Sequence, residues 1–506
     1  AVALTGGKPW EEILVNGRPI KFLGTCYHDS HPLMGRAVTP DVTRRHLLLM
    51  KECNLNAVRM SHYPHVRELV ELADEIGLYV EDEASFCWAK GGNDLRRLPR
   101  IVEITAGLIA RDRNRPSVVF WSMCNETWGY GYAFERAHEW AEASDPSRPH
   151  SAGLSAWLEI ATLHNPLTIA RMDEHEGLDQ PLLFDESLCI FQGIYNDTLD
   201  LQRDPGIRDY YGNCLPGIVD HMLRSRTTQG SFIWCWGDDL FCVPGRGLEY
   251  GRDSAREYFV ESSYRMPGRG IVGDAPWGAV DGWLRRKPEF WHIKKSHSPV
   301  RIRGDVLPVP AAGQPIRVPV ENRYDFLDLH ALKATWGLGS EKGETACAIA
   351  PHRSGVIEIA PREPVKEGAA LSLDFHDGAG RLIDTYRLAL GKEVAAAPPC
   401  MFLSGKTLTR NKEELLCGVL ERIRGAGFAV AIHTSTGLSQ RVVVGKDAVL
   451  LELPALHVLR RDRQYAAIPD RHSWRMTGLD IKEAQDGNVV ISVNGEYADF
   501  QGGYRH

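Results

Sequence analysis

Two glutamates stand at the ends of apolar segments and could act as a chemical pair. Glu126 closes the run "SVVFWSMCNE" and Glu186 closes "PLLFDE". A carboxylate at the end of a buried strand must reach solvent, find a partner or serve a purpose. Glycoside hydrolysis requires two such groups facing each other, one to protonate the leaving oxygen and one to attack the anomeric carbon. The simpler alternative is that both pair with buried arginines such as Arg59 and are structural.

The elements that must position these glutamates alternate along residues 20–297. Eight short apolar runs are separated for the most part by helix-like segments, and "TPDVTRRHLLLMKECN" begins with Thr39 as an expected N-cap before a proline. Eight strands with intervening helices close into a (β/α)8 TIM barrel, so the predicted fold class is α/β. The runs are "IKFLGTCYH", "NAVRMSHY", "LYVEDEA", "VVFWSMCNE", a weak "PHSAG", "IATLHNP", "PLLFDES" and "GSFIWCW".

Polar or aromatic side chains follow nearly every run, where each strand should end. In a TIM barrel these ends meet at one face, which carries the active site. We expect Asn125 to hold a sugar hydroxyl and Trp236 to offer its ring as a stacking platform. The candidate substrate-binding residues are His28, Asp29, His62, Asn125, His164 and Trp236.

Two other chemistries have less support. His28 and His31 of "HDSH" flank an aspartate, but at a strand-to-loop junction this spacing does not bring both rings to one side, and no HExxH or CxxC motif accompanies them. We therefore expect no metal ligands here. Cys124 lies inside an apolar run and points away from Asn125 by strand alternation, which indicates a packed core thiol and not a nucleophile.

The pattern changes after Pro299. Period-two alternation in "PIRVPVENRYDFLDLHALKATWGL" and "ALSLDFHDGAGRLIDTYRLAL" predicts an antiparallel β-sandwich of immunoglobulin type over residues 298–393. We expect residues 394–426 to be a linker region. A new series of short strands predicts part of a C-terminal β domain over residues 427–506.

The composition disfavours several classes of partner. The 506 residues include 66 acidic and 59 basic side chains, with a formal net charge of −7 that is dispersed along the chain, so no nucleic-acid partner is expected. No apolar stretch approaches the length of about 18 residues that a membrane span needs, so no membrane partner is expected either. Eleven scattered cysteines do not form a disulfide framework, which favours a reducing, cytoplasmic compartment.

Several motifs together resemble glycoside hydrolase family 2, in the family's order and with similar spacing over residues 13–297. They are "LVNGRPIKFLGTCYHDSHPLMGR", "LLLMKECNLNAVRMSHYP", "IGLYVEDEA", "RDRNRPSVVFWSMCNE", "DPSRP", "PLLFDES" and "GSFIWCWGDD". Within the family, "HPLMGR" and "SHYP" are similar to the large β-galactosidases. In that group further domains precede the barrel, so we expect residues 1–19 to be a lead-in strand from a missing preceding domain.

The resemblance implies a role for each candidate. Glu126 would be the acid/base and Glu186 the nucleophile of a retaining mechanism. His164 stands where the family usually has a tyrosine that hydrogen-bonds the nucleophile, so we expect it to donate to Glu186. The sugar would be contacted by His28, His62 and Asn125, with Trp236 beneath it.

The resemblance also implies that a magnesium site is lost. The magnesium ligands that β-galactosidases carry after the "DEA" strand end would fall at Cys87 and Ala89, which cannot serve as oxygen ligands. We therefore expect neither a metal nor another cofactor.

The function expected from these patterns is that of a retaining exo-β-glycosidase of β-galactosidase type, with a carbohydrate substrate as partner and homo-oligomer assembly left open. The segment "VDGWLRRKP" lacks the Asn-x-Lys pair that β-glucuronidases use for the sugar carboxylate, which disfavours a glucuronide. The alternatives are another β-glycoside specificity within the family and a catalytically silent or fragmentary carbohydrate-binding barrel.

Overall fold

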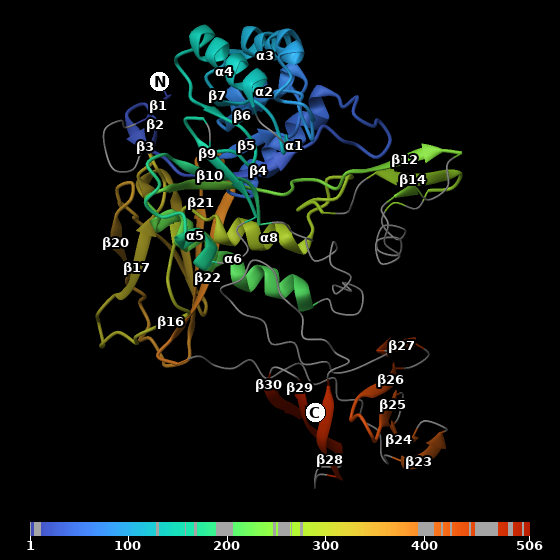
Figure 1. Ribbon diagram of the computed structural model, residues 1–506. Helices are drawn as coiled ribbons and strands as arrows, with labels where there is room; N and C mark the ends of the chain where they lie inside the picture. The colour runs from blue at the N-terminus through green and yellow to red at the C-terminus, as the bar shows by residue number, and fades with distance from the viewer. Residues whose placement is uncertain are drawn as a thin grey trace. The chain divides into compact units, whose positions relative to one another are not determined.

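The structure is a computed structural model, and its described residues fall into two compact units (Figure 1). One unit holds the described residues up to 392 and the other holds those from 409 onward. The structure describes residues 2–4, 12–127, 131–156, 158–165, 169–188, 206–245, 249–250, 264, 266–273, 277–392, 409–415, 418–425, 428–444, 447–450, 474–483, 489–497 and 500–505.

An eight-stranded parallel sheet forms the centre of the first unit, in the order β8-β7-β6-β5-β4-β11-β10-β9. The outer strands β8 and β9 approach each other where the Ile160 N–H donates to the His150 carbonyl at 3.1 Å, which brings the sheet round into a barrel. The predicted TIM barrel is therefore confirmed. The strands are β4 (Phe22–Tyr27), β5 (Ala57–Met60), β6 (Tyr79–Glu83), β7 (Val118–Ser122), β8 (His150–Ser151), β9 (Ala161–His164), β10 (Leu182–Ser187) and β11 (Thr228–Ile233).

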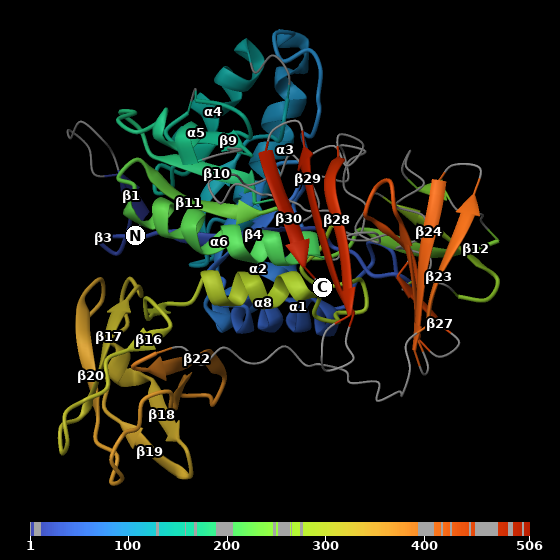
Figure 2. The ribbon, with the colours of Figure 1, turned by 90° about the horizontal axis from the view of Figure 1, so that it is seen from below.

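Helices cover the outside of this sheet, and α6 and α8 pack side by side (Figures 1 and 2). Helix α1 begins at Pro40 after Thr39, as the sequence predicts, although the Thr39 side chain makes no capping bond. The helices are α1 (Pro40–Glu52), α2 (Arg67–Ile76), η1 (Leu95–Arg97), α3 (Leu98–Asp112), α4 (Tyr132–Ser144), α5 (Ile169–Asp173), α6 (Gly206–Arg224) and α8 (Pro288–Ser296).

Two small sheets accompany the barrel. The N-terminal residues form a three-stranded antiparallel sheet of β1 (Val2–Leu4), β2 (Ile13–Val15) and β3 (Arg18–Pro19), where the sequence suggested a single lead-in strand. After the last barrel strand, β12 (Leu240–Pro244), β13 (Glu249–Tyr250) and β14 (Arg269–Gly273) form a second sheet that the sequence analysis did not predict.

Two facing sheets follow the barrel, as period-two alternation predicts. One has the order β15-β17-β20 and the other β16-β22-β21-β18-β19, and inward residues such as Val318, Ile357, Leu373 and Leu388 share one core. The elements are β15 (Val300–Arg301), β16 (Val306–Leu307), β17 (Ile316–Asn322), η3 (Leu329–Ala331), β18 (Lys333–Leu338), β19 (Glu341–Thr345), β20 (Ser354–Ile359), β21 (Ala370–His376) and β22 (Leu382–Leu390).

The second unit consists of two antiparallel sheets, β23-β24-β25-β26-β27 and β28-β29-β30. Its first two strands lie inside residues 394–426, so the linker prediction is wrong for that part. The sequence did not predict these strands because charged residues interrupt their apolar alternation. Arg410 pairs with Glu421 and Arg422 with Glu413 across the two strands. The strands are β23 (Thr409–Leu415), β24 (Gly418–Gly425), β25 (Phe428–His433), β26 (Ser439–Val444), β27 (Asp447–Leu450), β28 (Arg475–Glu483), β29 (Val489–Tyr497) and β30 (Phe500–Arg505). Where the structure describes the chain, no helix is both long enough and apolar enough to cross a membrane.

Close packing between β4 and β11 gives a test of the barrel. Gly230 has φ +141°, and a Cβ placed there would lie 2.0 Å from the Phe22 carbonyl oxygen. We expect Gly230→Ala to lower the free energy of unfolding by at least about 2 kcal/mol, because backbone and not a mobile side chain must yield. Urea denaturation followed by circular dichroism measures this change.

The matched control is Gly217→Ala in α6, where an added Cβ meets nothing within 4 Å. Alanine there should be neutral or raise the free energy of unfolding by up to about 1 kcal/mol, because it favours the helix. Equal effects of the two substitutions would contradict the close approach of β4 and β11.

Candidate active site

The two predicted glutamates meet at the C-terminal ends of the barrel strands. Glu126 follows β7, Glu186 lies in β10, and His164 ends β9. One donor atom from each of these three side chains lies within 4.8 Å of the others. The structure thus brings together three side chains that are separated by up to 60 residues in sequence.

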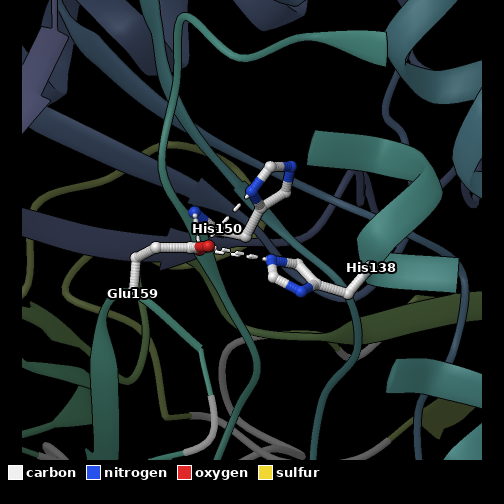
Figure 3. A group of neighbouring side chains, drawn as sticks. All are labelled: His138, His150 and Glu159. Atoms are coloured by element: carbon white, nitrogen blue, oxygen red, sulfur yellow. Dashed lines mark hydrogen bonds and ion pairs between the residues drawn. The ribbon is translucent and has the colours of Figure 1, made fainter. Parts of the chain in front are cut away.

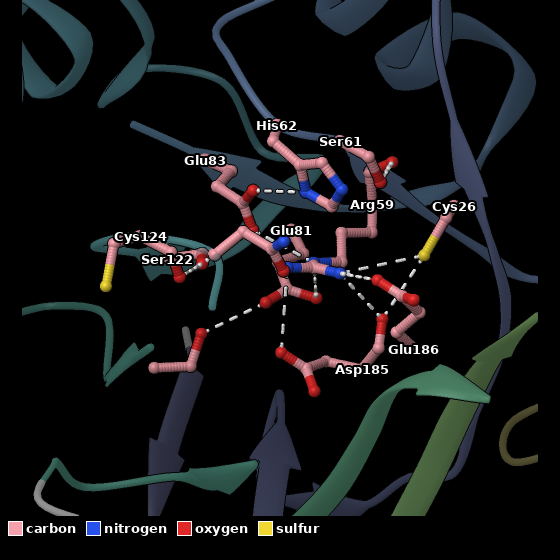
Figure 4. A network of polar contacts seen from close by, with 12 residues as sticks. Cys26, Arg59, Ser61, His62, Glu81, Glu83, Ser122, Cys124, Asp185 and Glu186 are labelled. Atoms are coloured by element: carbon pink, nitrogen blue, oxygen red, sulfur yellow. Dashed lines mark hydrogen bonds and ion pairs between the residues drawn. The ribbon is translucent and has the colours of Figure 1, made fainter. Parts of the chain in front are cut away.

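A fully buried guanidinium, that of Arg59 in β5, lies beside Glu186 within a network of polar side chains (Figure 4). It donates to Glu83 Oε2 through Nε at 2.9 Å and Nη2 at 2.6 Å, and to Asn125 Oδ1 at 2.8 Å. It also lies 3.7 Å from an Asp185 oxygen and 3.8 Å from a Glu186 oxygen. The arginine pairing considered from the sequence therefore exists for Glu186, whereas the described partners of Glu126 are other side chains. Arg59 in β5 also pairs with carboxylates of β6 and β10.

An irregularity in β10 explains how two consecutive carboxylates reach one cation. Neighbouring residues of a regular strand point to opposite faces, yet Asp185 and Glu186 both approach Arg59. The pairing of β10 with β9 and with β11 shifts register at this point. Such bulges re-aim side chains next to active sites.

The Glu126 carboxylate is held from two sides. It accepts a hydrogen bond from His164 Nδ1 at 2.8 Å and another from the Trp88 indole N–H at 2.6 Å. These donors, His164 first, lower the pKa of Glu126 to about 2 against the opposing effect of burial. Trp88 was missed in the sequence analysis because it lies in a loop, where no strand or helix periodicity marks it.

His164 contacts the opposite glutamate from the one expected. Its Nδ1 lies 2.8 Å from Glu126 but 3.8 Å from Glu186, so the predicted hydrogen bond to Glu186 is replaced by one to Glu126. Burial lowers the pKa of His164, but the charges of Asp185 and Glu186 outweigh burial and raise it to about 10. Burial raises the pKa of Glu186, and His164 and Arg59 oppose that rise.

The aromatic side of the site is formed by Trp234 and not by Trp236. Trp236 is fully buried, and its indole N–H donates to His46 Nδ1 at 3.0 Å, so the platform prediction for Trp236 is wrong. Trp234 instead stacks on His62, with ring centroids 5.3 Å apart and planes 6° apart, and it forms a T-shaped pair with His28 at 5.5 Å. Both tryptophans follow the last residue of β11, where strand alternation no longer says which one faces the site.

The other predicted substrate-binding residues are His28, Asp29, His62 and Asn125, and each has its own partners. His62 Nδ1 is 2.8 Å from Glu83 Oε1, and His28 lies beside it. Asn125 is buried, with its oxygen on Arg59 and its amide donating to Cys87 Sγ at 3.5 Å. Asp29 accepts a hydrogen bond from the Val66 N–H at 3.3 Å and lies 3.5 Å from His65 Nδ1.

The residues beside Glu126 do not fit the magnesium ion that the resemblance implies. Cys87 offers a thiol that already accepts from Asn125, Ala89 offers a methyl group, and the Trp88 N–H occupies a Glu126 oxygen as a donor. Magnesium requires oxygen ligands in near-octahedral geometry.

The charge on His164 gives a pH-dependent prediction. Its pKa is about 10 in the folded protein and 6.5 without the fold, so its stabilising effect is complete below pH 6.5 and is lost as the pH rises through 10. We expect the difference in free energy of unfolding between the parent and His164→Gln to shrink steadily over that window. Urea denaturation of both proteins at several pH values measures it. A difference that stays constant across the window would contradict a charged His164.

Known proteins are similar to this chain over the same barrel. Residues 8–244 match the family model described as glycosyl hydrolases family 2, TIM barrel domain. A β-galactosidase of Aeromonas hydrophila is 29% identical over 398 residues, which are 74% of this chain and 36% of that protein. A β-galactosidase of Pectobacterium atrosepticum is 34% identical over 241 residues, which are 45% of this chain and 22% of that protein. The chain thus spans about a third or less of the length of these curated relatives.

Solved structures are also similar. A β-galacturonidase from Eisenbergiella tayi bound to galacturonate is 21% identical, with a TM-score of 0.45 over 58% of this chain and 54% of that one. A β-glucuronidase of Faecalibacterium prausnitzii is 19% identical, with a TM-score of 0.43 over 58% of this chain and 51% of that one. The eight-stranded barrel and the match over residues 8–244 lead to one conclusion: this part of the chain is similar to the TIM barrel domain of glycosyl hydrolases family 2.

Proposed function

We propose that this protein is a retaining exo-β-glycosidase of β-galactosidase type, which hydrolyses terminal β-linked sugars by double displacement. The observation that carries the proposal is the approach of Glu126 and Glu186, each with an oxygen within 4.8 Å of the other at the barrel mouth. Retaining enzymes hold their carboxyl groups about 5 to 5.5 Å apart, whereas inverting enzymes leave about 6.5 to 9.5 Å for a water molecule. The short separation favours direct attack.

In the proposed first step, a Glu186 oxygen attacks the anomeric carbon as the bond to the leaving oxygen breaks. Glu126 gives a proton to that oxygen, which leaves as an alcohol. In the second step Glu126 takes a proton from water, and the water oxygen bonds to the anomeric carbon as the bond to Glu186 breaks. Glu186 is released as a carboxylate, and Glu126 again carries the proton that it gave up in the first step.

The pKa values in the free protein determine which side chain carries the catalytic proton before substrate binds. The pKa of Glu126 is lowered to about 2 and that of His164 is raised to about 10, so at neutral pH the proton lies on His164. It needs to cross only the 2.8 Å hydrogen bond from His164 Nδ1 to reach Glu126. In this proposal His164 stores the proton that Glu126 delivers.

The same electrostatics favour an assignment with the roles exchanged. A raised pKa marks a general acid and a lowered pKa marks a nucleophile, and burial raises the pKa of Glu186 while hydrogen bonds lower that of Glu126. We keep Glu186 as the nucleophile because it sits deeper, 3.8 Å from Arg59, whereas Glu126 has solvent access for a leaving group and a water molecule.

Recognition of the sugar is assigned to the side chains around the glutamates. Trp234 and His62 form a stacked aromatic pair, His28 lies beside both rings, and Asn125 directly precedes Glu126. The names of the two curated relatives support galactose as the sugar. Other β-glycosides, and a silent carbohydrate-binding barrel, remain the alternatives.

Substitution of each glutamate separates the roles. We expect Glu186→Ala to lower kcat by at least about a thousandfold on every substrate, because no covalent intermediate forms. Glu126→Ala should still be glycosylated by an aryl glycoside with a good leaving group, and azide should then restore turnover as a glycosyl azide. Steady-state kinetics and product analysis measure both effects.

Glu68→Ala is the matched control, since Glu68 is exposed in the first turn of α2. It should leave kcat unchanged. A β-glycosyl azide formed by Glu186→Ala and not by Glu126→Ala would show that the two roles are exchanged, because azide that only replaces a missing nucleophile gives the α-glycosyl azide.

The choice of sugar gives a further prediction. Among nitrophenyl β-glycosides of galactose, glucose, mannose, fucose and glucuronic acid, the galactoside should have the highest kcat/KM for the 506-residue chain. A higher value for the glucuronide would overturn the galactosidase specificity. Absence of turnover with every member, together with unchanged sugar binding in Glu186→Ala, would support the silent barrel.

A further inference from the structure

A second cluster of ligating side chains lies on the barrel wall, apart from the two glutamates of the site (Figure 3). It consists of His138 from α4, His150 from β8 and Glu159 from the segment before β9. His138 Nε2 lies 3.0 Å from a Glu159 oxygen, and His150 Nδ1 lies 3.5 Å from the other oxygen. The carboxylate thus lies between two imidazole rings.

This cluster sits where the barrel sheet is least complete. Strand β8 has two residues and is the last in the order of hydrogen-bonded strands at one end, and β9 is the last at the other. Between them, the His150 N–H donates to Glu159 Oε2 at 3.0 Å, and the His150 carbonyl accepts from the Ile160 N–H at 3.1 Å. A side-chain oxygen therefore takes the place of a strand partner at this seam.

The donor set matches what a divalent transition metal takes. Two imidazoles and one carboxylate, with a fourth position for water, form an ordinary zinc site. Metal–ligand bonds of about 2.0 to 2.2 Å in a tetrahedron place ligand atoms roughly 3.3 Å apart. The 3.0 Å and 3.5 Å separations from Glu159 to the two histidines bracket that value, and all three donor atoms lie within 4.8 Å.

The burial of the three side chains also fits a ligand site. His150 is 1% exposed, and neither of its ring nitrogens has a hydrogen-bond partner among the described residues. A buried imidazole without partners loses the hydrogen bonds it would make to water. Glu159 and His138 keep some exposure, 28% and 14% of their side chains, so an ion can enter from solvent. Direct pairing of Glu159 with His138 alone leaves His150 without a hydrogen bond.

We propose that His138, His150 and Glu159 bind a divalent transition metal ion of the zinc class and that this ion fastens α4 to the seam between β8 and β9. The imidazoles bind in their neutral form and the carboxylate as an anion, and no electron is transferred. Because β9 carries His164 at its end, the ion stabilises the strand that positions this residue. The proposal does not depend on glycosidase activity.

Zinc binding by the full chain tests this proposal. The protein is stripped with a chelator, dialysed and titrated with Zn²⁺ against a chromophoric competitor, with Co²⁺ absorption as a second readout. We expect His138→Ala and Glu159→Gln each to weaken binding of one equivalent at least tenfold and to remove the rise in melting temperature that Zn²⁺ gives the parent. His330→Ala is the matched control, since His330 is an exposed histidine that also pairs with a carboxylate, and it should change nothing.

The group of Glu126, His164 and Glu186 could also hold a cation, so the titration is repeated in a His164→Gln background. The equivalent assigned to His138, His150 and Glu159 should persist there and still be lost on adding Glu159→Gln. Two results would overturn the proposal: no zinc bound by the parent, or a binding constant that neither His138→Ala nor Glu159→Gln changes. Glu159→Gln keeps the side-chain shape, so a folded variant is available even if His138→Ala does not fold.

Discussion

The buried charge of Arg59 is the constraint on which the interior of the barrel depends. Its guanidinium is fully buried, and carboxylates from β6 and β10 surround it. Removing one partner of such a buried group costs about 3 to 5 kcal/mol, because the charges left behind remain uncompensated. Arg59 therefore allows a barrel to keep several acidic side chains in its core, where apolar residues would otherwise be expected.

The carboxyl groups around Arg59 have different pKa values because each lies in a different position relative to the guanidinium. Burial raises the pKa of Glu83, but the charge of Arg59, then His62 and then the hydrogen bond from Ser122 outweigh burial and lower this pKa to about 2. Glu81 lies 3.8 Å from Arg59, and burial raises its pKa well above the ordinary value. Glu186 is at the same distance from the guanidinium as Glu81, and its pKa is also raised. Glu126 lies outside this set and is held by His164 and Trp88. The pKa values of the two proposed catalytic groups are therefore shifted in opposite directions, downward for Glu126 and upward for Glu186.

Much of the barrel could be predicted from the sequence because its signal is local. Each strand is a short apolar run, and even the weak "PHSAG" run corresponds to β8. The gathering of His28, His62, Asn125, Glu126, His164 and Glu186 at one face follows from barrel topology alone. The register shift in β10, the loop position of Trp88 and the orientations of Trp234 and Trp236 depend on tertiary packing, and no period in the sequence records them. The hairpin of β23 and β24 was missed for a related reason, since charged residues that pair across the two strands occupy several of its positions.

The central claim is that Glu186, and not Glu126, forms the covalent bond to the sugar. Trapping of the glycosyl-enzyme tests it most directly. An activated β-galactoside with fluorine in place of the hydroxyl next to the anomeric carbon slows both steps, while its good leaving group lets the first step proceed, so the intermediate accumulates. Mass spectrometry of the digested protein should find one added fluorosugar on the peptide that contains Glu186. Label on the peptide that contains Glu126 would contradict the account, and so would a protein that turns over galactosides but acquires no label.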